Sequence, residues 1–394
     1  MAAWLSWVKS RWFHIALAAW TLSTVLVCIR VARHPGSHSA FRGVRTAGIA
    51  WLHQGRLYGA DTGFLYTPLI AGIHSPFALL PEAIAEVLWR VMIGVGFPLV
   101  LWFNARALFR FSRDQFASLL LLTLPLTLNT LNNGQSNIVL VVLCLGATAA
   151  AAHARWWLCA ACAAFAIYWK VYPIALALLL TVVFPKKLGV RIVVCVIVLF
   201  VVSLLLQAPQ YVVDQYHRWI ATLISDPRRE IDYYGKNRDF YLLLRVVGIP
   251  ITTLWWTVLQ LLTAACAAVI CLFGRIRNQT LLFGLMCLAI AWMLLFGPAT
   301  EATTYVLIAV PSAYLVLLGW FRQSGHTAFS VSIAAYVGFI FAEVVNSWLG
   351  IKQYIYLVHA VQPAVALCFC AALFCWWKEQ AYVEHGAPLS LADR

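Results

Sequence analysis

Apolar runs about as long as a bilayer is thick recur along almost the whole chain, and this feature limits the possible folds more than any other. Inside lipid every backbone N–H and C=O must be paired within the protein, and runs of this length achieve that as helices. Hydrophobic residues make up 63% and charged residues 11% of the sequence, which leaves too little polar surface for a soluble globule. The sequence therefore predicts an all-α, polytopic transmembrane helix bundle.

We expect about 10–12 spans, since each crossing needs about 20 apolar residues. The two spans that meet at Trp169-Lys170 are short and could form one bent or re-entrant element. Basic residues precede the first run, as in a signal peptide, but residues 15–28 contain no convincing cleavage site, so we expect a retained first helix. The whole chain, 1–394, is predicted to be one integral membrane domain. The runs lie at residues 12–30, 84–106, 116–130, 137–153, 156–169, 171–185, 190–207, 250–273, 280–296, 304–320, 327–346 and 354–376.

The short connections between these spans differ in charge, and the difference predicts orientation. Two of them, 131–136 and 297–303, contain neither Lys nor Arg. Because basic connections stay in the cytoplasm, we expect both termini and a polar tail at 377–394 to be cytoplasmic. Each remaining short connection contains at least one basic residue: 106–115, 154–156, 186–191, 274–279 and 321–326.

Two longer connections, 31–64 and 208–249, are also basic, although the same topology makes them extracytoplasmic loops. Their arginines could bind an anionic group such as a lipid phosphate, for which Arg offers bidentate hydrogen bonds. They could equally lie against anionic headgroups. The formal charge of +14 comes from residues that flank spans, so membrane lipids are the expected partner and nucleic acid is not.

The loop 31–64 has the pattern of an amphipathic helix. Apolar residues (Phe41, Val44, Gly48, Trp51-Leu52) fall on one face and Arg42, Arg45 and His53 on another, which predicts a helix along the membrane surface. The only acid of this loop is Asp61. It could be a general base, or a turn residue within Gly59-Ala60-Asp61-Thr62-Gly63.

Polar residues interrupt the apolar runs at three further places, and each has two interpretations. Asn133, Gln135 and Asn137 could line a polar cavity or form a plain turn. Lys170 could bind phosphate or extend to the membrane interface. Glu301 and Tyr305, one helical turn apart, could share a functional face, or Glu301 could merely cap a helix.

Several kinds of site are excluded by spacing. The histidines form no metal-ligand pattern, and the sequence contains no Gly-rich phosphate loop and no nucleophile elbow. All eleven cysteines lie in or beside apolar runs, and the Cys159-x-x-Cys162 spacing indicates packing. We expect no metal and no nucleotide cofactor.

The order of several motifs resembles glycosyltransferase family 87. They are the loop ending in Phe64-Leu65-Tyr66-Thr67-Pro68-Leu69, then Asn133-Gly134-Gln135-Ser136-Asn137, then Lys170-Val171-Tyr172-Pro173. The stretch Gly297-Pro298-Ala299-Thr300-Glu301 and the approach Asn237-Arg238-Asp239-Phe240 to Arg245 resemble a bacterial branch of that family. The resemblance extends over roughly residues 35–320.

This resemblance implies a GT-C architecture whose active site opens at the extracytoplasmic face of the plasma membrane. It implies transfer of a hexose, best known as mannose, from a polyprenyl-phosphate donor to a lipid or glycan acceptor, with inversion and a carboxylate base. Relatives usually have an Asp-Phe pair early in the first loop, where this chain reads Ser39-Ala40-Phe41, so the role of base falls on Asp61, with Asp239 and Glu301 in reserve.

The candidates for binding the donor phosphate are Lys170, Arg238 and Arg245. Asn133, Gln135, Asn137 and Tyr305 complete the expected substrate-binding set. A different class, a membrane transporter or lipid flippase, also fits the span count. Transporters usually contain internal repeats with broken helices in both halves, and the two basic loops share charge but not sequence.

Overall fold

The computed structural model describes residues 2–59, 62–225, 237–273, 279–298, 300–321, 324–348 and 355–383, and within these ranges every regular element is helical. The predicted all-α class is confirmed. The helices are α1 (Ala2–Arg33), α2 (Phe41–Leu52), α3 (Pro68–Ala78), α4 (Glu82–Ala107), α5 (Arg113–Asn133), α6 (Asn137–Ala152), α7 (Trp156–Trp169), α8 (Ile174–Val183), α9 (Pro185–Leu206), α10 (Pro209–Ile224), α11 (Phe240–Val246), α12 (Thr253–Phe273), α13 (Gln279–Phe296), the 3₁₀ helix η2 (Ala302–Ile308), α14 (Ala309–Trp320), α15 (His326–Trp348) and α16 (Ile355–Val383).

Every predicted span coincides with a helix, but the helices fall into two length classes. Among the described residues, seven are long and apolar enough to cross a membrane: those beginning at residues 11, 82, 185, 253, 302, 326 and 357. Four apolar helices are shorter, within α6, α7, α8 and α13. Helix α5 has 21 residues but is not among the seven long apolar helices. The structure therefore supports a multi-pass membrane protein, and four of its apolar helices are shorter than a full crossing requires.

The junction between α7 and α8 lies deep in the bundle. At 14 and 10 residues, these helices are too short to cross a hydrocarbon core of about 30 Å at 1.5 Å per residue. The Tyr168 hydroxyl donates a hydrogen bond of 2.8 Å to the carbonyl of Val196, which lies near the middle of the full-length helix α9. The junction that contains Lys170 is thus held about halfway along a neighbouring span.

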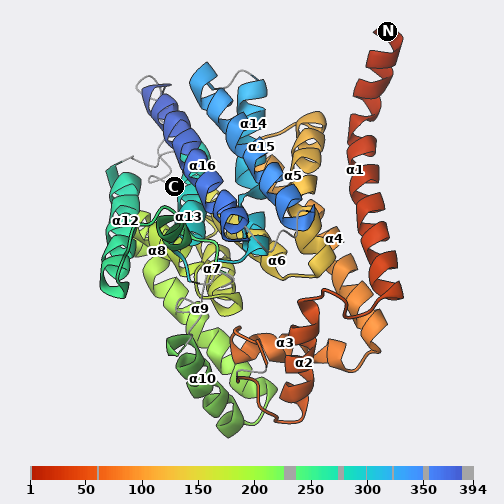
Figure 1. Ribbon diagram of the computed structural model, residues 1–394, viewed down its shortest axis with the longest axis vertical. Coiled ribbons are helices and arrows are strands. Elements are labelled where there is room, and N and C mark those ends of the chain that lie inside the picture. The colour runs from red at the N-terminus through yellow and green to blue at the C-terminus, as the bar shows by residue number, and fades with distance from the viewer. Residues whose placement is uncertain are drawn as a thin grey trace.

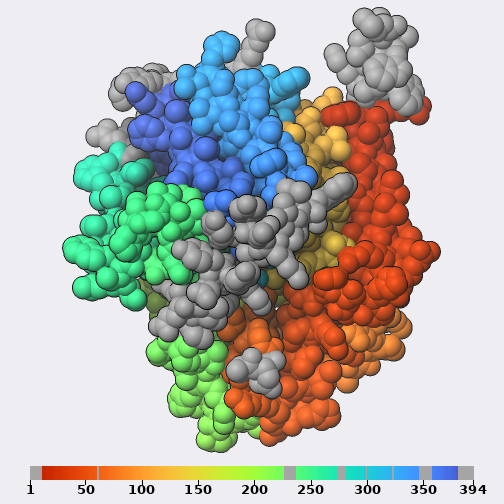
Figure 2. Space-filling model, in the orientation of Figure 1, coloured from red at the N-terminus to blue at the C-terminus, as the bar shows by residue number. Residues whose placement is uncertain are grey.

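Three shorter helices, α2, α3 and α10, gather at one end of the molecule, beyond the bundle (Figure 1). Figure 2 shows the segments that contain them packed side by side at that end. The predicted amphipathic helix is confirmed as α2, and its apolar face is buried against α3, so that Trp51 is 2% exposed. Arg45 of α2 donates to the carbonyls of Phe77 and Leu80 at the C-terminal end of α3. The protein itself thus covers most of the apolar face of α2.

The most buried candidate span is the continuous segment Ala302–Trp320, formed by η2 and α14, of which 94% is buried. It is the central column of the bundle, in contact with α5, α6, α13, α15 and α16. Helix α1, in contrast, runs along one side of the molecule (Figure 1). Glu301 stands directly before the central column, where η2 begins.

The predicted loops and tail contain more helix than the sequence indicated. Within 208–249 the structure forms α10 and α11, while residues 226–236 lie outside the described ranges. Helix α16 continues to Val383, so the first seven residues of the expected 377–394 tail are helical. The remainder of that tail, 384–394, lies outside the described ranges.

Candidate active site

A cavity of about 540 Å³ lies between the outer helices and the bundle. Its walls come from parts of the chain that are far apart in sequence: the start of α2, the loop before α3, the turns after α5 and α7, the end of α10 and the residues before η2. The polar and charged residues among them include three predicted site residues, Gln135, Lys170 and Glu301. The lining residues are Ser39, Ala40, Gly43, Val44, Thr62, Gly63, Phe64, Leu65, Tyr66, Gln135, Lys170, Val171, Tyr172, Leu223, Pro298 and Glu301.

Lys170 enters this cavity because helix α7 ends there. The backbone of Lys170 is extended, with φ −151° and ψ 147°, which ends the helix one residue after Trp169. The ammonium nitrogen Nζ lies 5.6 Å from the ring centroid of Tyr66 and 5.7 Å from that of Tyr172. Such distances permit a cation–π interaction with both rings. The two aromatic faces thus hold a positive charge at the cavity wall.

Glu301 supplies a negative charge to the same cavity. Its side chain caps η2, and its backbone N–H donates to the Thr304 hydroxyl at 3.1 Å. The Gln135 amide donates to its carboxylate at 3.4 Å. Burial raises the pKa of the neighbouring Tyr66 to about 12, and the charge of Glu301 acts in the same direction. Glu301 is therefore both a helix cap, as one interpretation expected, and a cavity residue.

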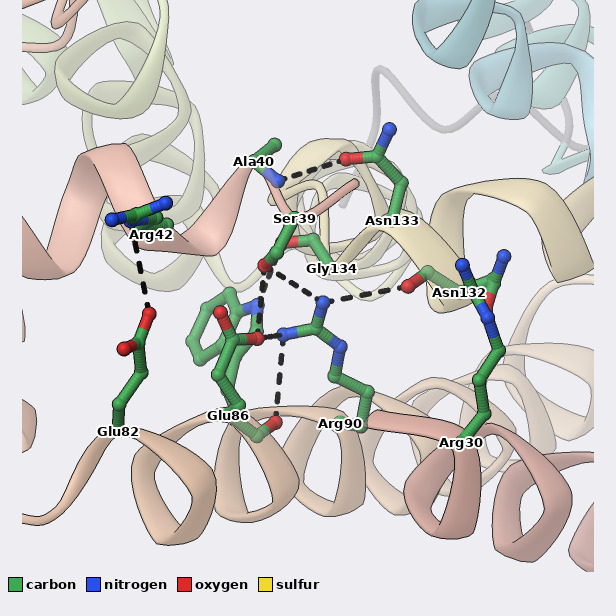
Figure 3. A network of polar contacts seen from close by, with 11 residues as sticks. Arg30, Ser39, Ala40, Arg42, Glu82, Glu86, Arg90, Asn132, Asn133 and Gly134 are labelled. Carbon is green, nitrogen blue, oxygen red and sulfur yellow. Dashed lines mark hydrogen bonds and ion pairs between the residues drawn. The ribbon is translucent and has the colours of Figure 1, made fainter. Parts of the chain in front are cut away.

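The rim formed by Ser39 and Ala40 is fixed by hydrogen bonds to elements behind it (Figure 3). The Ala40 N–H is 2.9 Å from both the side-chain oxygen and the backbone carbonyl of Asn133, which accept from it. Ser39 bonds to Glu86 and Arg90 of α4, whose side chains form a fully buried ion pair. The start of α2 is thereby attached to α4 and to the end of α5.

A family model describes most of this region. The model of glycosyltransferase family 87 matches residues 64–298, more than half of the chain. The protein belongs to glycosyltransferase family 87. No curated protein matches the sequence. In this glycosyltransferase the matched segment includes Gln135 and Lys170, while Ser39 and Glu301 lie outside it.

A second polar cluster of the glycosyltransferase lies on another side of the segment 300–305. It contains Arg238, which is 7% exposed and donates to the Gln362 side-chain oxygen at 2.9 Å. The Gln362 amide donates to Glu343 at 3.1 Å and to the Ala302 carbonyl at 3.3 Å. Burial lowers the pKa of Arg238 to about 10, and Glu343 opposes the shift, so the guanidinium stays charged at neutral pH.

The remaining described site predictions do not themselves line the cavity, although Asn133 and Asn137 bond to residues that do. Asp239 caps α11 by accepting from the Leu242 N–H at 3.0 Å. Tyr305 is buried and donates to the Arg238 carbonyl at 2.8 Å. Asn137 donates to the Thr303 hydroxyl at 3.5 Å and accepts from the Tyr172 hydroxyl at 3.4 Å. Asn133 anchors Ala40, and Arg245 is half-buried in the last turn of α11.

Asp61, the sequence-based candidate for the base, lies outside the described residues. The two residues that follow it, Thr62 and Gly63, line the cavity. Within the described residues, no group of three or more His, Cys, Asp or Glu side chains lies together in a way that could hold a metal ion. All eleven cysteines are free thiols.

Some polar residues inside the predicted spans were not among the predicted site residues. Glu86 and Arg90 are spaced i, i+4 within the span 84–106, a spacing that places both on one helix face. Glu343 is an acid within 327–346, and charged residues in spans are rare and usually have a role. Both signals were present in the sequence, but the further partners of these residues, such as Ser39 and Gln362, come from other segments of the chain and only the fold reveals them.

Proposed function

We propose that the protein is an integral-membrane hexosyltransferase whose donor is a sugar carried on polyprenyl phosphate and not a nucleotide sugar. Transfer takes place at the extracytoplasmic face of the plasma membrane. The observation that carries this proposal is the presence of Lys170 and Glu301 in the lining of one cavity of a family 87 glycosyltransferase. Family membership favours an enzyme over the transporter or flippase hypothesis.

The chemistry of transfer requires the two charges that the cavity provides. The acceptor oxygen attacks the anomeric carbon and loses its proton to a carboxylate, for which Glu301 is positioned in the cavity lining. The bond between the anomeric carbon and the phosphate oxygen breaks, and its electron pair remains on the departing polyprenyl phosphate. Lys170 stabilises that negative charge. A single displacement inverts the configuration at the anomeric carbon.

Among the described acids, Glu301 is the best candidate for the base because it lines the cavity. Asp239 instead accepts a hydrogen bond from the Leu242 N–H at the start of α11. Asp61 remains the alternative, given its neighbours Thr62 and Gly63 in the cavity wall. For the phosphate we propose Lys170 ahead of Arg238, since the Arg238 side chain is buried and bonded to Gln362. Mannose is the proposed sugar, and a lipid or glycan is the proposed acceptor.

Purified protein in lipid nanodiscs tests the proposal. Radiolabelled polyprenyl-phosphate mannose, glucose and galactose are supplied separately, with alkyl glycosides as acceptors, and the product is analysed by NMR for its anomeric configuration. We expect transfer with inversion from one donor, and loss of transfer in Glu301→Gln. Unchanged turnover in Glu301→Gln together with loss in Asp61→Asn would assign the base to Asp61. Absence of transfer from all three donors, together with net uptake by the same protein reconstituted into vesicles, would contradict the proposed activity.

A further inference from the structure

The hydroxyl of Ser39 is held in one orientation by two buried charged residues of α4 (Figure 3). It lies 2.9 Å from the carboxylate oxygen Oε2 of Glu86 and 2.9 Å from Nη2 of Arg90. Glu86 and Arg90 are both 0% exposed and are paired with each other. Ser39 itself is half-buried and lines the cavity. It is therefore the point at which this buried pair meets the space that a substrate would fill.

The surroundings of the pair leave it little freedom to move. Gly134, at φ +67°, closes over the guanidinium of Arg90, and a Cβ atom there would lie 2.3 Å from Cζ. Arg90 also donates to the Asn132 carbonyl at 3.4 Å, and the Trp89 indole donates to the Gly134 carbonyl at 2.9 Å. The positions of Glu86 and Arg90 are thus fixed by packing as well as by charge.

Hydrogen-bond accounting determines what Ser39 can offer to a ligand. A hydroxyl has one hydrogen and two acceptor lone pairs. The hydrogen of Ser39 goes to Glu86, because an ionised carboxylate can only accept. One lone pair accepts from Arg90, because a guanidinium can only donate. A single acceptor position is left, and it can be filled only by a group that donates.

We infer that Ser39 is a substrate-binding residue that accepts a hydrogen bond from a sugar hydroxyl, with Glu86 and Arg90 as positioning residues. The inference rests on the proposed function and adds to it the part of the substrate that this rim recognises. A phosphodiester has no proton to donate at neutral pH, so Ser39 cannot bind the donor phosphate while Glu86 holds its hydrogen. Recognition is thereby divided: Lys170 binds phosphate and Ser39 binds sugar.

Steady-state kinetics of Ser39→Ala, Ser39→Thr and the matched control Ser23→Ala test this division. Among the described residues, the Ser23 hydroxyl bonds only to the Ala19 carbonyl of its own helix, and Ser23 lies outside the cavity lining. We expect Ser39→Ala to raise the KM for the sugar-bearing donor or acceptor about three- to tenfold, with kcat within about twofold of wild type. Ser39→Thr retains the hydroxyl and restores the KM, and Ser23→Ala leaves both constants unchanged.

Product inhibition separates sugar recognition from phosphate recognition. Short-chain polyprenyl phosphate has no sugar, and above about pH 8 this monoester is a dianion with no proton to donate. At such a pH it should inhibit wild type and Ser39→Ala at the same concentration, whereas Lys170→Ala should need about tenfold more. A merely structural role for Ser39 would not produce this separation. Glu86→Gln supplies a second variant, because its amide can donate to Ser39. The Ser39 oxygen would then accept from both the introduced amide and Arg90 and have no acceptor position left for a sugar hydroxyl, so the KM should rise in this variant as well.

Three outcomes would overturn the inference. An unchanged KM in Ser39→Ala means that no sugar hydroxyl is bound there, although sugar transfer by the wild type would stand. A parallel loss of inhibition by polyprenyl phosphate means that Ser39 contacts the phosphate. Absence of transfer by the wild type from every donor would remove the proposed function and this inference with it.

Discussion

Two polar regions border the segment 300–305, and they differ in what their charges face. In the first region, the cavity, Lys170 and Glu301 are half-buried and line an open space of about 540 Å³. In the second, Arg238 and Gln362 are 7% and 1% exposed and bond to each other at 2.9 Å. Both regions contain an arginine or lysine and a glutamate inside a largely apolar bundle.

The comparison indicates two roles for a charged residue within this membrane bundle: it can hold helices in position or it can act on a ligand. Charges whose hydrogen bonds are made to buried side chains, as Arg238 and Glu343 both bond to Gln362, fix the position of helices, because removing a partner leaves a buried charge uncompensated. Charges that line a space can act on a ligand. In this molecule the second region supports the first: Gln362 donates to the Ala302 carbonyl, and the Arg238 N–H donates to the Thr300 carbonyl at 2.6 Å. These bonds hold the residues on both sides of Glu301.

The largest expected effect is on turnover in Glu301→Gln. Loss of a general base typically lowers the rate about 100- to 10,000-fold, and the amide retains an oxygen for capping η2, so folding should be preserved. The matched control is Glu343→Gln in the second region, which should lower kcat less than about fivefold. Initial rates with saturating donor measure both. Equal losses in the two variants would erase the distinction between the regions.

Lys170→Ala should have the next largest effect. Removing the positive charge should raise the KM for a polyprenyl-phosphate sugar about 10- to 100-fold, and Lys170→Arg should recover part of the affinity. Lys187, an exposed residue near the start of α9, provides the control Lys187→Ala. Donor titrations at two salt concentrations measure the effect. A KM that stays at the wild-type value in Lys170→Ala would place the phosphate elsewhere.

Gln362→Met should affect stability more than activity. The change removes the bonds to Arg238 and Glu343 and leaves buried polar atoms unpaired, which should cost about 1–3 kcal/mol of unfolding free energy. The control Gln54→Met changes an exposed side chain whose bond within the described part of the chain is to Gln207. Thermal unfolding in detergent compares the two. If Gln362→Met kept full stability but lost transfer, the second region would belong to the active site.

The smallest predicted effect is a pH dependence from His74 of α3. Burial lowers its pKa to about 4, from about 6.5 in an unfolded chain. The neutral form is favoured in the folded state, so this stability is complete above pH 6.5 and is lost as the pH falls toward 4. Between pH 7.5 and 5.5 the loss should be about 1 kcal/mol. His74→Phe, within a surrounding of aromatic rings, should remove that part of the pH dependence. An identical pH dependence in the variant would contradict the assignment.

The helices and the positions of three cavity residues could be predicted from the sequence, because both depend on local patterns. Apolar runs indicate spans, and polar interruptions within them indicate Gln135, Lys170 and Glu301. The separation of the two regions could not be predicted. It depends on contacts between residues 67 to 166 positions apart, as the bonds of Arg238 to Tyr305 and Gln362 and of Glu301 to Gln135 illustrate.

The role of Ser39 could not be predicted either, because it also depends on contacts between residues far apart in the chain. In sequence, Ser39-Ala40-Phe41 is notable only for lacking an acid, whereas the fold gives Ser39 a carboxylate partner from α4, 47 residues further along the chain. A helix-face argument identifies Glu86 and Arg90 as a pair, since i, i+4 residues are neighbours. It does not reveal that the pair faces the start of α2.

The most direct test of the central claim is a cryo-EM structure with a non-transferable C-glycoside analogue of a polyprenyl-phosphate hexose. We predict that the phosphate binds within about 4 Å of Lys170 Nζ, with the sugar against Ser39 and with the Glu301 carboxylate facing the anomeric carbon. Binding of the phosphate to Arg238 in the second region, with the cavity empty, would contradict this prediction.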